Sequence, residues 1–267
     1  MTDDEFVVSI LIRFRLPFLK YLGIRETDPC PCSVTKGINS PIQLCTEDHI
    51  LKCRSLGAYI TRHDMLSEKT IQMIRSTGMT VKREPRINFG TKHRGDAMYM
   101  SNGIVHINDT TVVSPTKENT IPLASKTPGH AMAEAKRQKL KGYAKFLSTK
   151  GTSLTILAYE VFGAMSEEVT HLVQRLNYEM NRQAPEDATW NTATFYTYWI
   201  KALSVTLHRG TAMAAIRIAE DILTNCRPSD RETRHLLEVQ PIPVVDDEVS
   251  TTAQGSPDRD ESGDLIW

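Results

Sequence analysis

The sequence predicts an α/β protein in which a mixed sheet is flanked by helices, with a metal-binding segment before this core and a helical layer after it. Three observations support this prediction. Short β-branched segments surround an Asn-Gly pair, amphipathic helical patterns lie on either side of them, and four of the five cysteines fall between residues 30 and 53. The chain has 267 residues, 40% of them hydrophobic, which is enough for one buried core.

Residues 1–28 contain the apolar stretch FVVSILIRFRLPFLKYLG at 6–23, in which Pro17 would interrupt a helix. We interpret this segment as the remnant of an upstream region. The first residues are acidic and then mildly apolar, without the features of a secretory signal, so we expect an intracellular location in the nucleus or cytoplasm. No run of about 18 apolar residues occurs, and a membrane partner is therefore not expected.

Residues 29–63 are predicted to form a zinc knuckle, because clustered cysteines in a chain without an export signal favour metal over disulfides. Two close thiolates and a second ligand pair after a loop form the donor set of tetrahedral zinc. The predicted ligands are Cys30, Cys32, His49 and Cys53. The Cys-x-Cys spacing is tight, so Cys45 remains an alternative to Cys32. The ion would be structural, since the segment is too short to fold alone.

Residues 64–165 are predicted to form the core of the protein. A helix is expected over 64–76, where apolar residues recur at helical spacing and Gly78 follows. After it we expect three strands, a proline-containing loop, a helix rich in alanine and lysine, and a buried β-branched strand. Their predicted ranges are 80–84, 96–101 and 104–113 for the strands, 114–127 for the loop, 131–148 for the helix and 152–162 for the last strand.

The pair Asn102-Gly103 predicts a two-residue hairpin turn between the second and third strands. Such a turn sets the register, with Tyr99 opposite His106 and Asp96 opposite Asp109. Side chains facing each other in this way lie about 5 Å apart. Two ionised carboxylates at that distance repel by roughly 3 kcal/mol if the effective dielectric constant is about 20. The pair therefore predicts a bound divalent cation such as Mg²⁺. The alternative is a register shifted by one residue, or an Asp109 that ends its strand in solvent.

Three further residues are candidates for the same site. Glu160, on the last predicted strand, would complete a set of three carboxylates, although an acid at the end of an apolar strand is often a surface residue. Lys136 and Lys139 are three residues apart on one helix and share a face. One of them could orient an attacking water or stabilise a phosphate, and the alternative is that both are solvated.

Residues 166–226 are predicted to form a helical extension. Ser166 is a suitable cap for a helix over 168–180, and 190–223 favours one or two more helices with a break near His208 to Gly210. After Cys226 the composition changes to Pro, Asp, Ser and Thr, which predicts a disordered acidic tail at 227–267.

Charge is distributed unevenly although the formal net charge is zero. Residues 51–95 carry ten Lys/Arg and three Asp/Glu, whereas residues 227–267 carry four and ten. A basic middle segment predicts contact with phosphates without reading of bases, and the alternative is a solvated charged face. The candidate nucleic-acid contacts are Arg62, His63, Lys82, Arg83 and Arg94.

Several motifs in this order together resemble a known family. Arg94-Gly95-Asp96 is followed after twelve residues by Asp109-Thr-Thr-Val and by a lysine-rich helix ending at Tyr143. This order resembles the restriction-like endonuclease of site-specific non-LTR retrotransposons, a PD-(D/E)XK-type nuclease with the pattern Arg-Pro-Asp, Asp-Val-Thr-Val and Lys-x-x-Lys-Tyr. The segments CPC at 30–32, EDHILKC at 47–53 and RH at 62–63 are similar to the zinc knuckle that precedes this nuclease. The segments YEVFG at 159–163, YW at 198–199 and LHRGTA at 207–212 are similar to its closing part, so the resemblance covers about residues 10–225.

The resemblance implies a restriction-endonuclease-like core that nicks DNA with Mg²⁺, so that a 3′ hydroxyl can prime reverse transcription. Asp96, Asp109 and Glu160 would hold the Mg²⁺, and a lysine would help to activate water. Here Gly95 stands where the family pattern has proline, and the lysine spacing differs. Lys139, four residues before the tyrosine, is therefore favoured over Lys136.

The expected partners are DNA and a reverse transcriptase or element RNA acting in trans, because the chain has no Tyr-x-Asp-Asp polymerase motif. It resembles a detached C-terminal part of a retrotransposon protein. Two alternatives remain: a catalytically inactive zinc-containing nucleic-acid-binding remnant, and a zinc-dependent protein-interaction module. The retained acids favour the enzyme, and the altered lysine spacing favours the inactive remnant.

Overall fold

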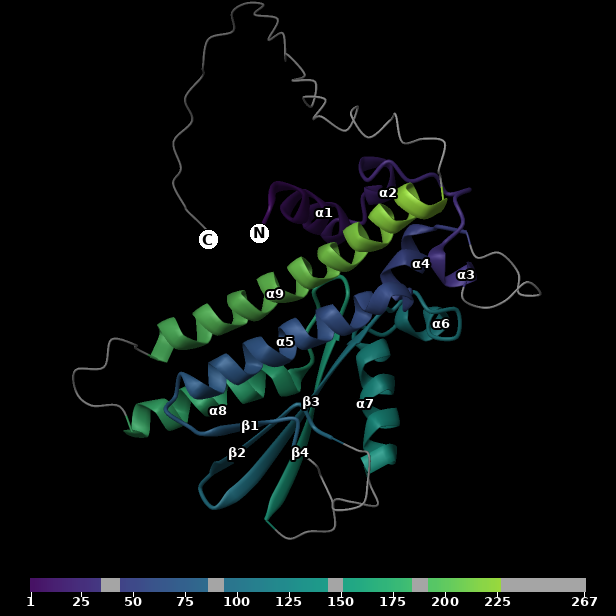
Figure 1. Ribbon diagram of the computed structural model, residues 1–267. Helices are drawn as coiled ribbons and strands as arrows, with labels where there is room; N and C mark the ends of the chain where they lie inside the picture. Colours follow the sequence, from purple (N-terminus) through teal and green to yellow (C-terminus); the bar gives the residue numbers. More distant parts are fainter. Residues whose placement is uncertain (35–43, 86–93, 144–150, 184–191, 227–267) are drawn as a thin grey trace, which may run out of the picture. The chain divides into compact units, whose positions relative to one another are not determined.

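Four strands form one mixed sheet with helices on both of its faces (Figure 1). The computed structural model describes residues 1–34, 44–85, 94–143, 151–183 and 192–226, all within one compact unit, Met1–Glu232. The predicted disordered tail at 227–267 lies outside the described residues. The α-helices are α1 Asp3–Arg13, α2 Phe18–Tyr21, α3 Pro31–Val34, α4 Glu47–Lys52, α5 Ala58–Arg75, α6 Ile121–Ala124, α7 His130–Tyr143, α8 Glu167–Gln183 and α9 Thr192–Asp221. The strands are β1 Val81–Arg83, β2 Ala97–Ser101, β3 Ile104–Val113 and β4 Thr152–Glu160, and short helical turns cover Ser55–Gly57 and Ile222–Cys226.

The strand order is β1-β2-β3-β4, with β1, β2 and β3 antiparallel and β4 parallel to β3. The turn between β2 and β3 has positive φ at both central residues, 50° at Asn102 and 74° at Gly103, as a type I′ turn requires. Tyr99 pairs with His106, so the predicted register is confirmed. The β-branched segment after residue 151 forms the parallel strand β4, which makes the sheet mixed, as predicted.

The two faces of the sheet are covered by different helices (Figure 1). One face packs against α5 and α8, and α9 packs on these two helices; the shared core includes Leu66, Leu157 and Tyr159, all fully buried. The other face packs against α7 through a smaller cluster containing Val113, Met132 and Ala158. Because side chains alternate along a strand, residues at odd numbers in β3 point towards α7.

The N-terminal segment packs onto the C-terminal half of α9. Val8, Ile12 and Phe18 share one core with Ala215, Ile218 and Ile222, and the buried cysteines 30, 45 and 53 belong to the same cluster. The predicted upstream remnant is therefore part of the described fold. Among the described residues, no helix combines the length and the apolar character needed to cross a bilayer.

Two predicted boundaries were wrong. The core helix begins at Ala58, not Asp64, directly after Gly57 with φ 65°, so the predicted boundary between knuckle and core falls inside α5. The long helix α9 is not broken at His208–Gly210. Instead, a Cβ at Gly210 would lie 3.2 Å from the Cα of Arg62. This glycine thus allows α5 and α9 to approach closely, which is a packing role and not a helix break.

Candidate functional site

Asp96 and Asp109 meet at one end of the β2–β3 hairpin. Asp96 directly precedes β2, and its N–H donates to the carbonyl of Asn108 at 2.8 Å, which extends the ladder beyond the strand. Gly95 permits this extension: a Cβ there would lie 2.5 Å from Cγ2 of Ile107, and its N–H donates to the carbonyl of Pro85 at 3.1 Å. A proline at position 95 could not donate that hydrogen bond.

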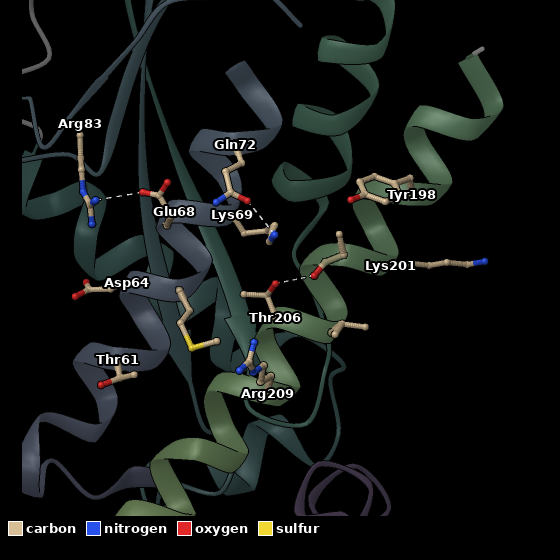
Figure 2. Close-up of a pocket in the computed structure, with 13 residues that line it drawn as sticks. Thr61, Asp64, Glu68, Lys69, Gln72, Arg83, Tyr198, Lys201, Thr206 and Arg209 are labelled. Carbon is tan, nitrogen blue, oxygen red and sulfur yellow. Dashed lines mark hydrogen bonds and ion pairs between the residues drawn. The ribbon is translucent and has the colours of Figure 1, made fainter. Parts of the chain in front are cut away.

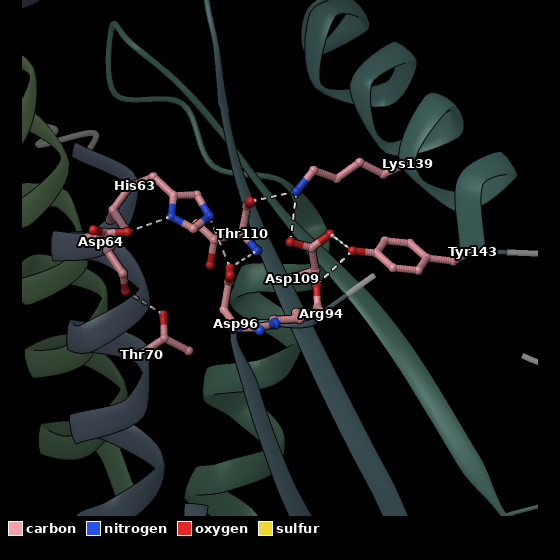
Figure 3. Close-up of polar contacts among 10 residues, drawn as sticks. His63, Asp64, Thr70, Arg94, Asp96, Asp109, Thr110, Lys139 and Tyr143 are labelled. Atoms are coloured by element: carbon pink, nitrogen blue, oxygen red, sulfur yellow. Dashed lines mark hydrogen bonds and ion pairs between the residues drawn. The ribbon is translucent and has the colours of Figure 1, made fainter. Parts of the chain in front are cut away.

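His63 joins the two aspartates from α5, as Figure 3 shows. One ligand atom from each of His63, Asp96 and Asp109 lies within 4.8 Å of the others, and we name these three residues the acid group. The predicted proximity of the two aspartates is confirmed, while His63 was expected only as a nucleic-acid contact. Side-chain exposures of 32% for His63 and 15% for Asp96 leave the group open to solvent.

Asp96 is held ionised by its neighbours. Its Oδ2 accepts the N–H of Thr110 at 2.5 Å and lies 3.2 Å from Nε2 of His63. Burial raises the pKa of Asp96, but the hydrogen bond and charge of His63 together with the Thr110 amide outweigh it, and the net pKa is below the ordinary value. The same hydrogen bond raises the pKa of His63 to about 9, against the opposing effect of burial.

Asp109 is buried and contacts two side chains of α7. Nζ of Lys139 donates to its Oδ1 at 2.8 Å and to the carbonyl of Thr110 at 2.9 Å. The hydroxyl of Tyr143 donates to Oδ2 at 2.9 Å and also lies 3.0 Å from the carbonyl of Arg94. Burial raises the pKa of Asp109 above its ordinary value in spite of the Lys139 ammonium, and the nearby Asp96 charge raises it further.

A third carboxylate lies behind the imidazole. Oδ1 of Asp64 is 3.1 Å from Nδ1 of His63, on the opposite side of the ring from Asp96. With Lys139, two potential cations therefore stand among three carboxylates. This excess of negative charge is compatible with binding of a cation.

Two sequence-predicted site residues lie elsewhere. Glu160 is opposite Val113 in the parallel register, four residues beyond Asp109 and about 13 Å along the strand. The structure therefore does not bring Glu160 to the aspartates, and its place in the predicted ligand set needs correction. Lys136 makes an ion pair with Glu168 of α8 and does not contact the acid group. Of the two candidate lysines, Lys139 is the one in the site.

The predicted nucleic-acid contacts also separate into groups. Arg62 is buried at 6% exposure, its guanidinium donates to the carbonyl of Leu51, and burial lowers its pKa to about 10. It has no free surface for a phosphate, so that prediction was wrong: the close approach of α9 at Gly210 covers it. Lys82, Arg83 and Arg94 are exposed, and they remain predicted contacts.

The second cluster is formed by the four predicted zinc ligands, Cys30, Cys32, His49 and Cys53, which we name the Cys/His cluster. Their ligand atoms all lie within 4.8 Å of one another. Sγ of Cys30 is 3.5 Å from Sγ of Cys53, and Sγ of Cys32 is 3.3 Å from Nε2 of His49. Tetrahedral zinc with sulfur ligands at 2.3 Å separates them by about 3.8 Å, so this cluster could bind zinc.

Short local elements place these ligands. Cys32 lies in α3, and His49 lies in α4, where Thr46 caps the helix by accepting the His49 N–H at 3.1 Å. A hydrogen bond with Cys45 raises the pKa of Cys30 to about 12, and the bond with Cys30 raises the pKa of Cys53 to about 11. Cys45 thus lies against the cluster but is not one of the four grouped ligands. The Cys30/Cys32 pair fits the zinc geometry without replacement by Cys45.

A separate hollow of about 810 Å³ lies between α5 and α9 (Figure 2). It adjoins the acid group through Asp64 and is lined by both acids and bases, with Arg83 3.2 Å from Glu68. Lys201 and Arg209 line its α9 side. Because charges of both signs face this hollow, it is not a uniform binding surface for a polyanion.

Tyr143 was predicted only as part of a motif, and no role was predicted for Asp64. The signal for Tyr143 was its spacing, since residues 139 and 143 are four apart and share one face of α7. The signal for Asp64 was its position next to a histidine.

Comparison of the chain with models of protein families and with curated proteins found no match.

Proposed function

We propose that this chain is a metal-dependent DNA endonuclease with a restriction-endonuclease-like core, related to the nuclease of non-LTR retrotransposons. The observation that carries the proposal is the meeting of Asp96 and Asp109 at the hairpin, with the Lys139 ammonium 2.8 Å from Asp109. Two carboxylates that could hold a metal ion, with a lysine beside them, form a set of groups suited to metal-assisted phosphodiester hydrolysis.

The donor set fits a divalent cation, because two carboxylates on adjacent strands offer hard oxygen ligands. Asp96 and Asp109 would hold the ion, which would be Mg²⁺ in the simplest form of the proposal. When bound, such an ion withdraws electron density from phosphate oxygens and makes water more acidic. The chain's own contribution comes from Lys139, whose ammonium would stabilise negative charge on the phosphate, and from Tyr143, which orients Asp109.

Zinc in the Cys/His cluster would have a structural role, because all its ligands come from the chain and leave no open position. The exposed Lys82, Arg83 and Arg94 would contact the phosphate backbone of DNA. A reverse transcriptase or element RNA would act in trans, with the nick supplying the 3′ hydroxyl that primes synthesis.

A nicking assay on supercoiled plasmid tests this proposal. We expect Mg²⁺-dependent conversion to the open circle by the wild-type chain and a loss of at least about 100-fold in rate for Asp109→Asn, since a lost electrostatic contact in such a site has this magnitude. Glu160→Gln is the matched control, because Glu160 lies apart from the aspartates, and it should nick at the wild-type rate. The absence of metal-dependent nicking by the wild-type chain would remove the proposal.

One observation favours a second candidate, a zinc-containing protein that binds nucleic acid without cutting it. Lys139 and Tyr143 already occupy both oxygens of Asp109, so this carboxylate is partly neutralised without a metal. Salt-sensitive DNA binding by a chain that fails to nick with any divalent ion would support this candidate.

A further inference from the structure

The imidazole of His63 lies between two carboxylates. Its Nε2 is 3.2 Å from Asp96 and faces the acid group, while its Nδ1 is 3.1 Å from Asp64. In Figure 3, the His63 ring extends from α5 towards the hairpin, opposite Lys139 and Tyr143 of α7, and Asp64 lies on the α5 side of the ring. The ring thus presents Nε2 to Asp96 and Asp109, while Nδ1 contacts Asp64 on the other side.

This arrangement is typical of a metal-binding histidine. Such a histidine uses one ring nitrogen as the ligand and donates the other N–H to a carboxylate, which sets the tautomer and the orientation of the ring. Asp64 occupies the position of that carboxylate, and Nε2 lies within 4.8 Å of a ligand oxygen on Asp96 and on Asp109.

The charges at the site are consistent with this role. When His63 is a neutral ligand, three carboxylates and the Lys139 ammonium leave a charge of minus two, which a single dication balances. An imidazole nitrogen beside two carboxylate oxygens is also a mixed donor set. Mg²⁺ prefers oxygen ligands throughout, whereas first-row transition ions accept imidazole readily.

We infer that His63 is the third protein ligand of the acid group, with Asp64 as its positioning residue, and that this site takes a first-row transition dication in preference to Mg²⁺. The inference rests on the proposed function for what the bound ion does, but not for its binding. It replaces Glu160, the third ligand that the sequence predicted on the last strand, by His63 on helix α5.

Binding of Mn²⁺ to the full, zinc-loaded chain without DNA tests the inference, with free Mn²⁺ measured by electron paramagnetic resonance. Mn²⁺ accepts both oxygen and imidazole ligands and is the weakest binder of the first-row series, so it leaves zinc in the thiolate cluster. We expect one Mn²⁺ per chain in addition to the zinc, displaced only by a large excess of Mg²⁺. The bound Mn²⁺ should show magnetic coupling to an imidazole nitrogen.

His63→Gln should remove the nitrogen coupling and weaken Mn²⁺ binding about 10- to 100-fold, with a smaller change for Mg²⁺. Asp64→Asn should weaken Mn²⁺ binding by a similar factor, as expected for the carboxylate behind a ligating histidine. His171→Gln, at an exposed position on α8, is the matched control and should bind as the wild type does. Zinc content and thermal unfolding will show that each variant is folded.

Unchanged Mn²⁺ binding in His63→Gln, or wild-type binding that favours Mg²⁺, would overturn the inference. These results are separable from the proposed function. Nicking that depends on Asp109 but not on His63 would retain the function and reject the inference. Mn²⁺ binding through His63 in a chain that never nicks DNA would retain the inference and reject the function.

Discussion

The two candidate metal sites of this protein are built in opposite ways. The Cys/His cluster takes its ligands from residues 30–53, on two short helices and the residues next to them. The acid group draws on α5 and on the β2–β3 hairpin, and its contacts extend to α7. The first site is therefore local in sequence, whereas the second exists only after the sheet and two helices have assembled.

The sites also differ in how charge is balanced without an ion. In the Cys/His cluster, hydrogen bonds among thiols raise the pKa of Cys30 and Cys53 to about 12 and about 11, so these thiols stay neutral at physiological pH. In the acid group, Asp109 contacts Lys139 and Asp96 contacts His63. The acid group therefore has cationic partners within the chain, and we expect the Cys/His cluster to depend more strongly on a bound metal to hold its segment together.

Removal of zinc should have the largest effect on the protein. Structural zinc contributes roughly 10–16 kcal/mol of binding free energy in finger peptides, which is comparable to the whole stability of a domain. We expect Cys53→Ser, or treatment with a chelator, to abolish zinc binding and to lower the melting temperature sharply. The loss should extend beyond the knuckle, because Cys30, Cys45 and Cys53 share a core with α1 and α9.

Metal analysis and thermal unfolding by circular dichroism measure this effect, with Cys226→Ser as the matched control. In contrast, we expect Asp109→Asn to keep one zinc per chain and nearly the melting temperature of the wild type. A chelated chain that unfolds at the same temperature as the zinc-loaded chain would contradict the distinction between the two sites.

Separate substitution of each of the two candidate lysines of α7 tests the acid group alone. Lys139 contacts Asp109 at 2.8 Å, whereas Lys136 pairs with Glu168. We expect Lys139→Met to lower the nicking rate about 100- to 1,000-fold, the magnitude found when one preorganised donor is removed. Lys136→Met has the same chemical change outside the site and should nick at nearly the wild-type rate. Equal losses in the two variants would show that overall charge, and not contact with Asp109, matters.

Tyr143→Phe should have a smaller effect, on stability. Its hydroxyl donates to the buried Asp109 and lies 3.0 Å from the carbonyl of Arg94, and a hydrogen bond to a charged group contributes about 1.5–3 kcal/mol. We expect a loss of this size in the free energy of unfolding, measured with urea, without loss of zinc. A variant as stable as the wild type would mean that Tyr143 does not support the acid group.

The parts of the fold that depend on nearby residues could be predicted from the sequence. The Asn102-Gly103 turn set the register of β2 and β3, and so the proximity of Asp96 and Asp109, because a two-residue loop leaves one pairing. The Cys/His cluster was predictable for the same reason, since its ligands lie within a short segment and their spacing is chemically restrictive.

Contacts that depend on packing between distant elements could not be predicted in this way. The prediction that Glu160 lies with the aspartates was wrong. A long connection, and not a tight turn, sets the parallel register of β4 against β3, so this register could not be predicted from local sequence. Arg62 was expected at the surface because of its charge, although Gly210 on α9 permits a close approach that buries it. His63 and Lys139 reach the same hairpin from helices on opposite faces of the sheet, and no local pattern indicates this.

The smallest effect that we expect concerns Glu5, a carboxylate outside both metal sites whose negative charge is stabilised by hydrogen-bond donors of the chain itself. Oε2 of Glu5 accepts the N–H of Thr2 at 3.0 Å in the capping box of α1 and the Nε–H of Arg209 at 3.0 Å. Burial raises the pKa of Glu5, but these two donors outweigh it, and the net pKa lies below the ordinary value of 4.5. An acid of this kind needs no metal.

The sign of the pH dependence follows from the lowered pKa. Glu5 contributes stability that is present above pH 4.5 and is lost as the pH falls through its folded value, since protonation removes the charge that the two donors stabilise. We expect Glu5→Gln to be less stable than the wild type by up to about 1 kcal/mol at pH 6, as for a partly exposed ion pair. The difference should shrink as the pH falls from 6 to 3. Urea unfolding at both pH values measures it, and Arg209→Gln should show a similar loss at pH 6. A difference that grows towards pH 3 would mean that burial, and not the two donors, determines the pKa of Glu5. Glu5 would then behave as a buried carboxylate without a partner.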